Sequence, residues 1–436
     1  MLKLSMRVSK LTASFFVSAA LAAAAHASTA QFGVAPDNNQ SVAISAIHSA
    51  ETSLLINIYQ FDSPAILSAV TDAIIRGVTV KILIEGQPLP EVSAGGKKVI
   101  ATIQKAMKAS SNRSNRIFIM KQADADHPRR YKYDHAKYMV IDSASAYLSS
   151  ENFTATGHPN PGAVGNRGWA THVQDSDLAA QLTTIFKKDA NSNCSDITDL
   201  TQARTTAVPT KQPSASDEHR QAHAIAVGSG EVKSTQLIVS PDSGPGLNKF
   251  MASATRSLDL QQMSFPTHWK ATSAGTELGL MIQGALAAAS RGAHVRALLN
   301  DDRTFTSKPS PNSNLNAAKY LNQQASCKGL SVEGRIIDVK AVGITYVHNK
   351  GMLADGERAL VSSVNGTQNS IENNRETAVW LESSDAATYF GTAFDSDWSA
   401  SPVTTERSDL EAAMCPTGSF EELQDAPLIG YLGLTH

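Results

Sequence analysis

The chain carries one short pattern twice, and this duplication limits its possible folds more than any other feature. The pattern is His-x-Lys, then an Asp after four further residues, and Ser-Ser-x-Asn begins seven residues after that Asp. One copy runs from His135 to Asn152 and the other from His348 to Asn365, so the histidines stand 213 positions apart (348 minus 135). Identical internal spacing predicts a duplicated unit in which each half supplies the same chemical groups.

The residue types in each copy favour a site for a phosphate. If the apolar run 138–141 is a strand, the His and the Lys that precede it project from one face. Ser-Ser-x-Asn follows a turn at Asp142-Ser143 or Asp355-Gly356, so it lies on or after the next strand and can return beside the His. Two such sets brought together make a donor-rich, cationic pocket suited to a phosphate anion.

This double pattern resembles the signature of the phospholipase D superfamily. The resemblance implies that one His attacks phosphorus to form a phosphohistidine, that the other protonates the leaving alcohol, and that no metal or other cofactor is needed. The residues with chemical roles would be the catalytic pair His135 and His348, and the phosphate-binding Lys137, Lys350, Asn152 and Asn365. The supporting residues would be Asp142, Asp355, Ser150 and Ser363, although turn formation alone explains the two aspartates equally well.

The pattern also bears on metal binding. His and Asp side chains can bind zinc, but each His here has a Lys two residues away, and an ammonium repels a cation while it attracts a phosphate. We therefore predict no metal site. Imidazole, with a reference pKa near 6.5, can act as nucleophile or as acid near neutral pH.

An Asn-Arg pair follows each copy, and the next residue differs between the halves. It is Glu376 in the second half and Gly168 in the first. In enzymes resembling this one, an acidic residue here orients the catalytic His of the opposite half. The resemblance therefore gives His135 an orienting carboxylate and leaves His348 without one, unless another group, such as a residue near His172, replaces it. We predict His135 as nucleophile and His348 as general acid; the alternative is that Glu376 is only a surface carboxylate.

The repeat extends beyond the motifs. A strand-like segment, 53–61 or 257–265, is followed by a helix that ends in Arg-Gly and by a second strand, 78–84 or 293–299. Gly suits the left-handed residue that ends such a helix. Recurrence in this order predicts an α/β fold of two similar phospholipase D-like lobes, mixed sheets flanked by helices, with one active site at their interface in a monomer.

The chain divides into four parts. Residues 1–27 read as a cleavable export signal, because basic residues precede an apolar run and Ala-His-Ala ends it. The run is shorter than a spanning helix needs, which disfavours the alternative of a membrane anchor. An N-terminal lobe, 28–190, a polar linker or surface excursion, 191–234, and a C-terminal lobe, 235–436, follow. We expect a secreted or periplasmic protein.

The chain has three cysteines, Cys194, Cys327 and Cys415, whose spacing fits no zinc motif. In an oxidising compartment one pair can form a disulfide. Cys327 with Cys415 is our first choice, since both lie in the second half, but the sequence leaves the pairing open.

Composition helps to rank the substrates. A net charge of −2 and 6% aromatic residues give neither a general attraction to nucleic acid nor an extended base-stacking surface. We therefore expect a phosphodiesterase that removes the headgroup of a phospholipid at a membrane surface, with water or an alcohol as acceptor. The alternatives are an exported endonuclease with the same catalytic set and a non-catalytic homologue that binds phosphate or membranes. A cardiolipin-synthase-like activity is disfavoured, because no later stretch is long and apolar enough to span a bilayer.

Overall fold

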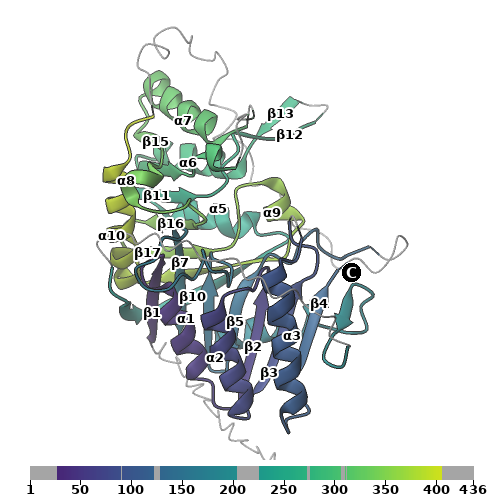
Figure 1. The fold of residues 1–436 in the computed structure, drawn as a ribbon. Coiled ribbons are helices and arrows are strands. Elements are labelled where there is room, and N and C mark those ends of the chain that lie inside the picture. The colour runs from purple at the N-terminus through teal and green to yellow at the C-terminus, as the bar shows by residue number, and fades with distance from the viewer. Residues whose placement is uncertain are drawn as a thin grey trace, which may run out of the picture.

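The computed structural model (Figure 1) describes residues 27–89, 91–121, 128–203, 225–272, 275–305, 310 and 312–404. Of the predicted export signal only Ala27 lies within these ranges, and Cys415 lies outside them. Among the described cysteines, Cys327 is disulfide-bonded and Cys194 has a free thiol. None of the helices in the described ranges combines the length and apolar character needed to cross a bilayer.

The first lobe is built on a nine-stranded sheet in the order β8-β4-β3-β2-β5-β6-β7-β1-β9. Only the β2–β3 and β3–β4 pairs are parallel. The strands are β1 (Ser28–Ala35), β2 (Ser53–Ile58), β3 (Thr79–Glu85), β4 (Arg116–Met120), β5 (Lys137–Ile141), β6 (Ser145–Ser149), β7 (Gly168–Val173), β8 (Ile197–Asp199) and β9 (Gly228–Val232).

The second lobe has a seven-stranded sheet in the order β10-β18-β17-β16-β11-β14-β15, and a separate hairpin of two strands. Read from β15, this order repeats the first sheet from β4 to β1, strand for strand. The sheet contains β10 (Ser234–Ser240), β11 (Ser257–Gln262), β14 (His294–Leu299), β15 (Val332–Ile336), β16 (Lys350–Ala354), β17 (Arg358–Ser362) and β18 (Glu376–Glu382), and the hairpin β12 (His268–Thr272) and β13 (Gly275–Leu278).

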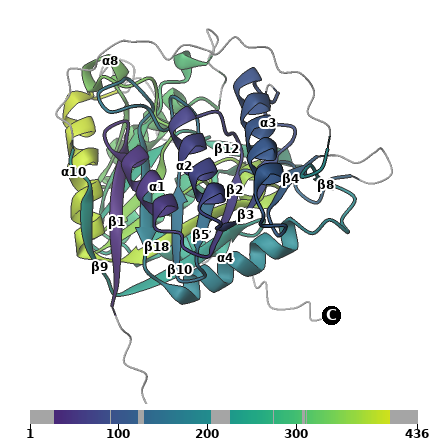
Figure 2. The same cartoon turned by 60° about the horizontal axis from the view of Figure 1, so that its bottom comes forward.

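Helices cover the outer face of each sheet, and the last helix of each lobe lies between the lobes. The first lobe contributes α1 (Asn39–His48), α2 (Pro64–Ile75), α3 (Ala94–Ala109) and α4 (Ser176–Asp189). The second contributes α5 (Gly244–Ser253), α6 (Leu280–Ser290), the 3-10 turn Asp302–Thr304, α7 (Asn314–Lys328), α8 (Val339–Val342), α9 (Gln368–Glu372) and α10 (Ser384–Ala400). Figure 2 shows α1, α2 and α3 side by side across the first sheet, with α10 beside β1 and β9. The predicted α/β class of two similar mixed sheets flanked by helices is confirmed.

Three apolar cores hold this arrangement together. One lies under α1, α2 and α3, and a second lies under α5, α6 and α7. The third joins the lobes, because Phe186 of α4 and Phe390 of α10 pack with residues from both sheets. In β2, Leu54 and Ile56 face the first core while Leu55 faces the third, as the alternation of side chains along a strand requires.

The predicted helix ends and turns take the expected backbone conformations. Gly77 and Gly292, which follow α2 and α6, have φ of 94° and 95°, where a side chain would be strained. The turns after β5 and β16 each place two residues at positive φ, Asp142-Ser143 and Asp355-Gly356. This geometry suits a tight hairpin and brings β6 and β17 back beside the motif strands.

The segment predicted as a linker, 191–234, contains two strands of the first sheet. β8 pairs with β4 at one edge, and β9 pairs with β1 at the other. The structure describes residues up to 203 and from 225, so the proposed connector between them stays a prediction.

A duplicated ion pair crosses between the lobes and is buried. Arg375, just before β18, donates to Asp189 of α4 at 2.6 Å, and Arg167, just before β7, donates to Asp397 of α10 at 2.7 Å. Each arginine also donates to a backbone carbonyl of the strand that pairs with the one it precedes, Ser240 at 2.6 Å and Ala35 at 2.8 Å. Both lobes are therefore fixed to each other by the same contact used twice.

Removing one member of this pair should destabilise the protein strongly. Arg375→Met leaves the Asp189 carboxylate buried without its cation, which should lower the free energy of unfolding by roughly 3–5 kcal/mol. The Arg375→Met/Asp189→Leu double variant should lose less, because no buried charge remains. Urea unfolding followed by circular dichroism measures both. The exposed pair Arg256–Glu357 is the control, where Arg256→Met should leave the free energy of unfolding nearly unchanged. Equal losses from both arginines would contradict the structural role of the buried pair.

Candidate active site

Each motif histidine is attached to the opposite lobe through the backbone. The His135 N–H donates to the Arg375 carbonyl at 2.8 Å, and the Arg375 N–H donates to the Tyr133 carbonyl at 2.8 Å. The second half repeats these bonds, with His348 N–H to the Arg167 carbonyl at 2.9 Å and Arg167 N–H to Tyr346 at 2.9 Å. The arginines that join the lobes thus also position the histidines, which lie two residues before β5 and β16.

His135 faces a buried carboxylate from the second lobe, as predicted. Its Nδ1 lies 2.8 Å from Glu376 Oε2. Three further groups donate to this carboxylate: Ser363 Oγ at 2.6 Å, Ser370 Oγ at 2.6 Å and Asn374 Nδ2 at 3.0 Å. Glu376 is therefore a fixed acceptor, and the alternative that it is a surface carboxylate is wrong, because the residue is fully buried.

His348 also has a carboxylate from the opposite lobe, and it comes from a residue that the sequence did not single out. Glu151 Oε2 lies 3.3 Å from His348 Nδ1, an ion-pair distance without the alignment of a good hydrogen bond. Asn166 Nδ2 donates to the same oxygen at 3.1 Å. The replacement is not near His172, whose Nε2 contacts Ser145 Oγ at 2.9 Å. The available signal was the acidic residue inside Ser-Ser-Glu-Asn, where the second copy has Val364.

The two motif lysines are fully buried and lie at the same centre. Lys137 Nζ donates to the His135 carbonyl, and Lys350 Nζ donates to the His348 carbonyl. The charge of each lysine lowers the pKa of the histidine in the other lobe, which requires the two sets to be close together. The structure therefore brings both His-x-Lys pairs to one place.

The asparagines and serines of the motifs bond to residues of their own lobes. Asn152 Nδ2 donates to Gln60 Oε1 at 3.3 Å, and the Asn365 N–H donates to Ser370 Oγ at 2.8 Å. The side-chain oxygens of both asparagines are buried without a hydrogen-bond partner among the described residues. Ser363 holds Glu376, whereas Ser150 Oγ accepts from the Trp169 N–H at 2.9 Å and so fixes the start of β7.

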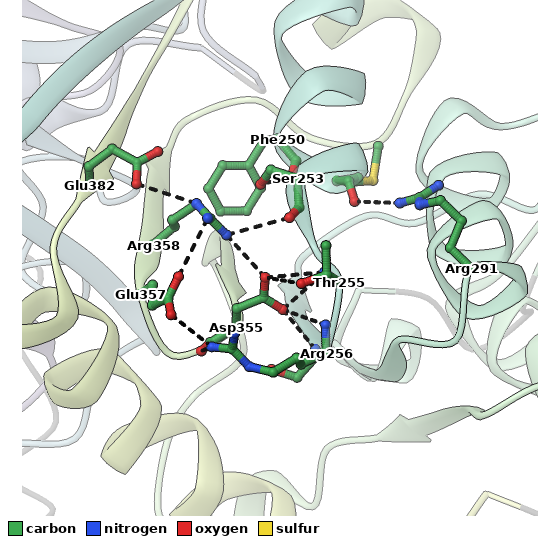
Figure 3. A network of polar contacts seen from close by, with 11 residues as sticks. Phe250, Ser253, Thr255, Arg256, Arg291, Asp355, Glu357, Arg358 and Glu382 are labelled. Carbon is green, nitrogen blue, oxygen red and sulfur yellow. Dashed lines mark hydrogen bonds and ion pairs between the residues drawn. The ribbon is translucent and has the colours of Figure 1, made fainter.

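The motif aspartates lie away from this centre and hold the backbone. Asp355 Oδ1 accepts from the N–H groups of Arg256 at 2.7 Å and of Ser257 at 3.0 Å, and Arg358 pairs with its other oxygen (Figure 3). Asp142 makes the same contacts before β2, accepting from the Ser53 N–H at 2.7 Å. These backbone hydrogen bonds lower the pKa of both carboxyls, although partial burial opposes them. Five residues of strand separate Asp355 from Lys350, roughly 17 Å, so its role is structural.

Burial sets the protonation of the site before an anion binds. It lowers the pKa of both histidines to about 4, although the adjacent carboxylates act in the opposite direction. Burial also lowers the pKa of Lys137 to about 8 and that of Lys350 to about 7, the latter with a contribution from the charge of Lys137. An arriving anion reverses this balance, since it favours every protonated form.

Anion binding should therefore take up protons. At pH 8 Lys350 is mostly neutral and Lys137 is about half protonated, so sulfate, which does not titrate there, should bind with proton uptake by the lysines. At pH 6 both lysines are already charged, so uptake there should come from the histidines. Calorimetry in buffers of different ionisation enthalpy gives the number of protons. Lys350→Met should reduce the uptake at pH 8. An uptake at pH 8 that Lys350→Met leaves unchanged would contradict this account.

The comparisons with known proteins agree with this geometry. Residues 43–190 and 247–398 match the family model described as "Cardiolipin synthase, PLD-like domain". The chain belongs to this PLD-like family. Each matched segment contains one motif histidine, so the predicted superfamily is confirmed for both halves. The comparison with curated proteins gave no match.

A solved structure with low sequence identity has the same fold over most of this chain. Phosphatidylserine synthase of Haemophilus influenzae Rd KW20 superposes with a TM-score of 0.60 at 12% identity, over 87% of this chain and 90% of that one. Nuc of Salmonella typhimurium, a phospholipase D family member, matches at 23% identity and a TM-score of 0.31, over 39% of this chain and 96% of that one. The likeness to the phosphatidylserine synthase therefore extends the shared fold over most of this chain.

Among the described residues, no group of three or more His, Cys, Asp or Glu side chains is placed to hold a metal ion. The described residues instead bring two imidazoles and two ammonium groups to one place.

Proposed function

We propose that this PLD-like protein is a phosphodiesterase that removes the headgroup of a phospholipid through a phosphohistidine intermediate. The observation that carries the proposal is the pair of buried histidines, each with a carboxylate from the opposite lobe at its Nδ1 and a buried lysine beside it. In both rings Nδ1 faces a carboxylate of the opposite lobe, so Nε2 is the nitrogen available for chemistry.

The reaction uses the two histidines in different roles. His135 Nε2 attacks phosphorus, the bond to the headgroup oxygen breaks, and His348 gives its proton to that oxygen. Water or an alcohol then attacks the phosphohistidine, and His348 takes the proton from the acceptor while the P–N bond breaks. Lys137 and Lys350 stabilise the charge that builds on the non-bridging oxygens. His135 is our choice as nucleophile because Glu376 is the better aligned and better supported carboxylate.

A lipid substrate is favoured by the residues around the histidines. The Tyr59 ring lies 4.6 Å from that of His135, and its hydroxyl accepts from the N–H of Leu89, whose side chain is 64% exposed. On the other side, Tyr346 lies 5.9 Å from His348 and 5.0 Å from Phe305, which is 55% exposed. Exposed apolar side chains two contacts from each histidine suit acyl chains better than a phosphate backbone.

The similar structure from Haemophilus influenzae is a phosphatidylserine synthase, which also favours phospholipid chemistry. We further propose that the protein acts as a monomer, since one chain supplies both histidines, and that it is exported. A nuclease with the same catalytic set is the second candidate, because two histidines and two lysines suit the phosphodiester of a nucleic acid as well.

Headgroup release from a panel of phospholipid vesicles, run beside a plasmid-cutting assay, decides between the two substrates. We expect release from at least one lipid and no cutting of DNA at the same enzyme concentration. His135→Ala and His348→Ala should each abolish turnover. The intermediate can be trapped with a labelled substrate whose leaving group needs no proton, if the reaction is quenched without acid, which preserves phosphohistidine. His348→Ala should then carry the label covalently, and His135→Ala should carry none. DNA cutting without headgroup release would overturn the lipid assignment.

Phe305 gives a more local test of the lipid substrate. Phe305→Ser should raise KM for vesicles about tenfold, because the exposed ring is lost, and leave kcat for a short-chain soluble phosphodiester within about twofold. Ile75→Ser, which removes an exposed apolar side chain from α2, is the matched control and should change neither value. A similar effect of both substitutions would show that the ring is not part of a lipid contact.

A further inference from the structure

The two orienting carboxylates occupy different positions of the repeat. Glu376 is the first residue of β18, whereas Glu151 follows β6 inside Ser-Ser-Glu-Asn. The position that corresponds to Glu376 is Gly168, and the position that corresponds to Glu151 is Val364. Each half therefore has one acidic and one non-acidic residue at this pair of positions, in opposite order.

The space around Glu151 depends on glycines. A Cβ atom added to Gly168 would lie 2.2 Å from Glu151 Oε1. One added to Gly157 would lie 2.5 Å from the Asn152 carbonyl oxygen and 2.9 Å from Glu151 Oε2. Real Cβ contacts are essentially never under 3.0 Å. The Glu151 carboxylate thus fills the volume that side chains at 157 and 168 would need.

The second half fills the same volume with side chains. Ser370 follows Asn365 by five residues, as Gly157 follows Asn152, and Ser370 Oγ donates to Glu376 Oε1 at 2.6 Å. The carboxylate there starts from the β18 position, and the residue after the paired serines is the apolar Val364. One half uses a carboxylate from the strand and a hydroxyl; the other uses a carboxylate from the loop and two glycines.

We propose that Glu151 is the positioning residue of His348, that it substitutes for the carboxylate missing at position 168, and that Gly168 is a glycine because Glu151 needs its space. This rests on the proposed function for its consequence. If His348 is the general acid, Glu151 supports protonation of the leaving alcohol, whereas Glu376 supports the attack by His135.

The two roles can be separated by the leaving group. An alkyl alcohol needs a proton as it leaves, but p-nitrophenolate does not. In single-turnover measurements, Glu151→Gln should slow the release of an alcohol headgroup roughly 10²-fold or more, by analogy with the loss of an orienting carboxylate in other enzymes. The same substitution should change the rate of the p-nitrophenol burst less than about threefold. Glu376→Gln should slow both. Glu51→Gln, at an exposed carboxylate, is the control.

Two results would bear on the proposal differently. The exchanged pattern, with Glu151→Gln slowing both reactions and Glu376→Gln slowing only the release of the alcohol, would keep Glu151 as a positioning residue and exchange the roles of the histidines. Unchanged rates with both leaving groups would overturn the proposal.

Exchanging the positions tests the spatial substitution itself. Glu151→Val should lose activity, and Gly168→Glu should lose it too, because two carboxylates would compete for one volume. The Glu151→Val/Gly168→Glu variant copies the second lobe and should recover to within about tenfold of the unmodified protein. A double variant that is folded yet as slow as Glu151→Val would overturn the idea that position 168 can supply the carboxylate.

A readout without substrate keeps the proposal separate from the assigned reaction. Nitrogen-15 shifts of labelled histidines report which ring nitrogen of His348 carries the proton. Nδ1–H should predominate with Glu151 and in the double variant, and be lost in Glu151→Val. Such a result in a protein with no phosphodiesterase activity would reject the proposed function but keep the positioning role, and a His348 signal indifferent to Glu151 would reject the role.

Discussion

The site depends on the buried contact that Arg167 and Arg375 make across the lobe interface. Each guanidinium pairs with an aspartate on the last helix of the other lobe, and each backbone binds the strand segment that carries the other lobe's histidine. A buried arginine is tolerable only with such complete pairing. The same two arginines therefore join the lobes through their side chains and position the histidines through their backbones.

Much of this fold could be predicted from the sequence, because the same order of motifs, helices and strands occurs in both halves of the chain. The strands after Arg76-Gly77 and Arg291-Gly292, the left-handed glycines and the turns after the motifs all lie where the patterns placed them. The edge strands β8 and β9 could not be predicted, because each is short, polar and stabilised by a strand distant in sequence. The local sequence pattern does not predict pairing between strands that are distant in sequence.

The site was predictable where chemistry and spacing agree, and not where a residue acts through space alone. His135, Lys137 and Glu376 converge with His348 and Lys350 as expected. Glu151 was missed because the motif leaves its position unspecified, and its role depends on the empty space at Gly168, which no spacing reveals. Asp142 and Asp355 belong to the motif but serve the backbone.

The position of β9 has a consequence for dividing the chain. This strand directly precedes β10 of the second lobe, yet it pairs along β1 and packs on α10. A fragment ended at residue 190, at the boundary suggested by sequence, would lack both β8 and β9. It would leave the backbone groups of β1 and β4 as open edges, which invite pairing with other chains. The first sheet is completed by a strand from beyond its own repeat, so the repeat unit and the unit that can be isolated in solution are not the same length of chain.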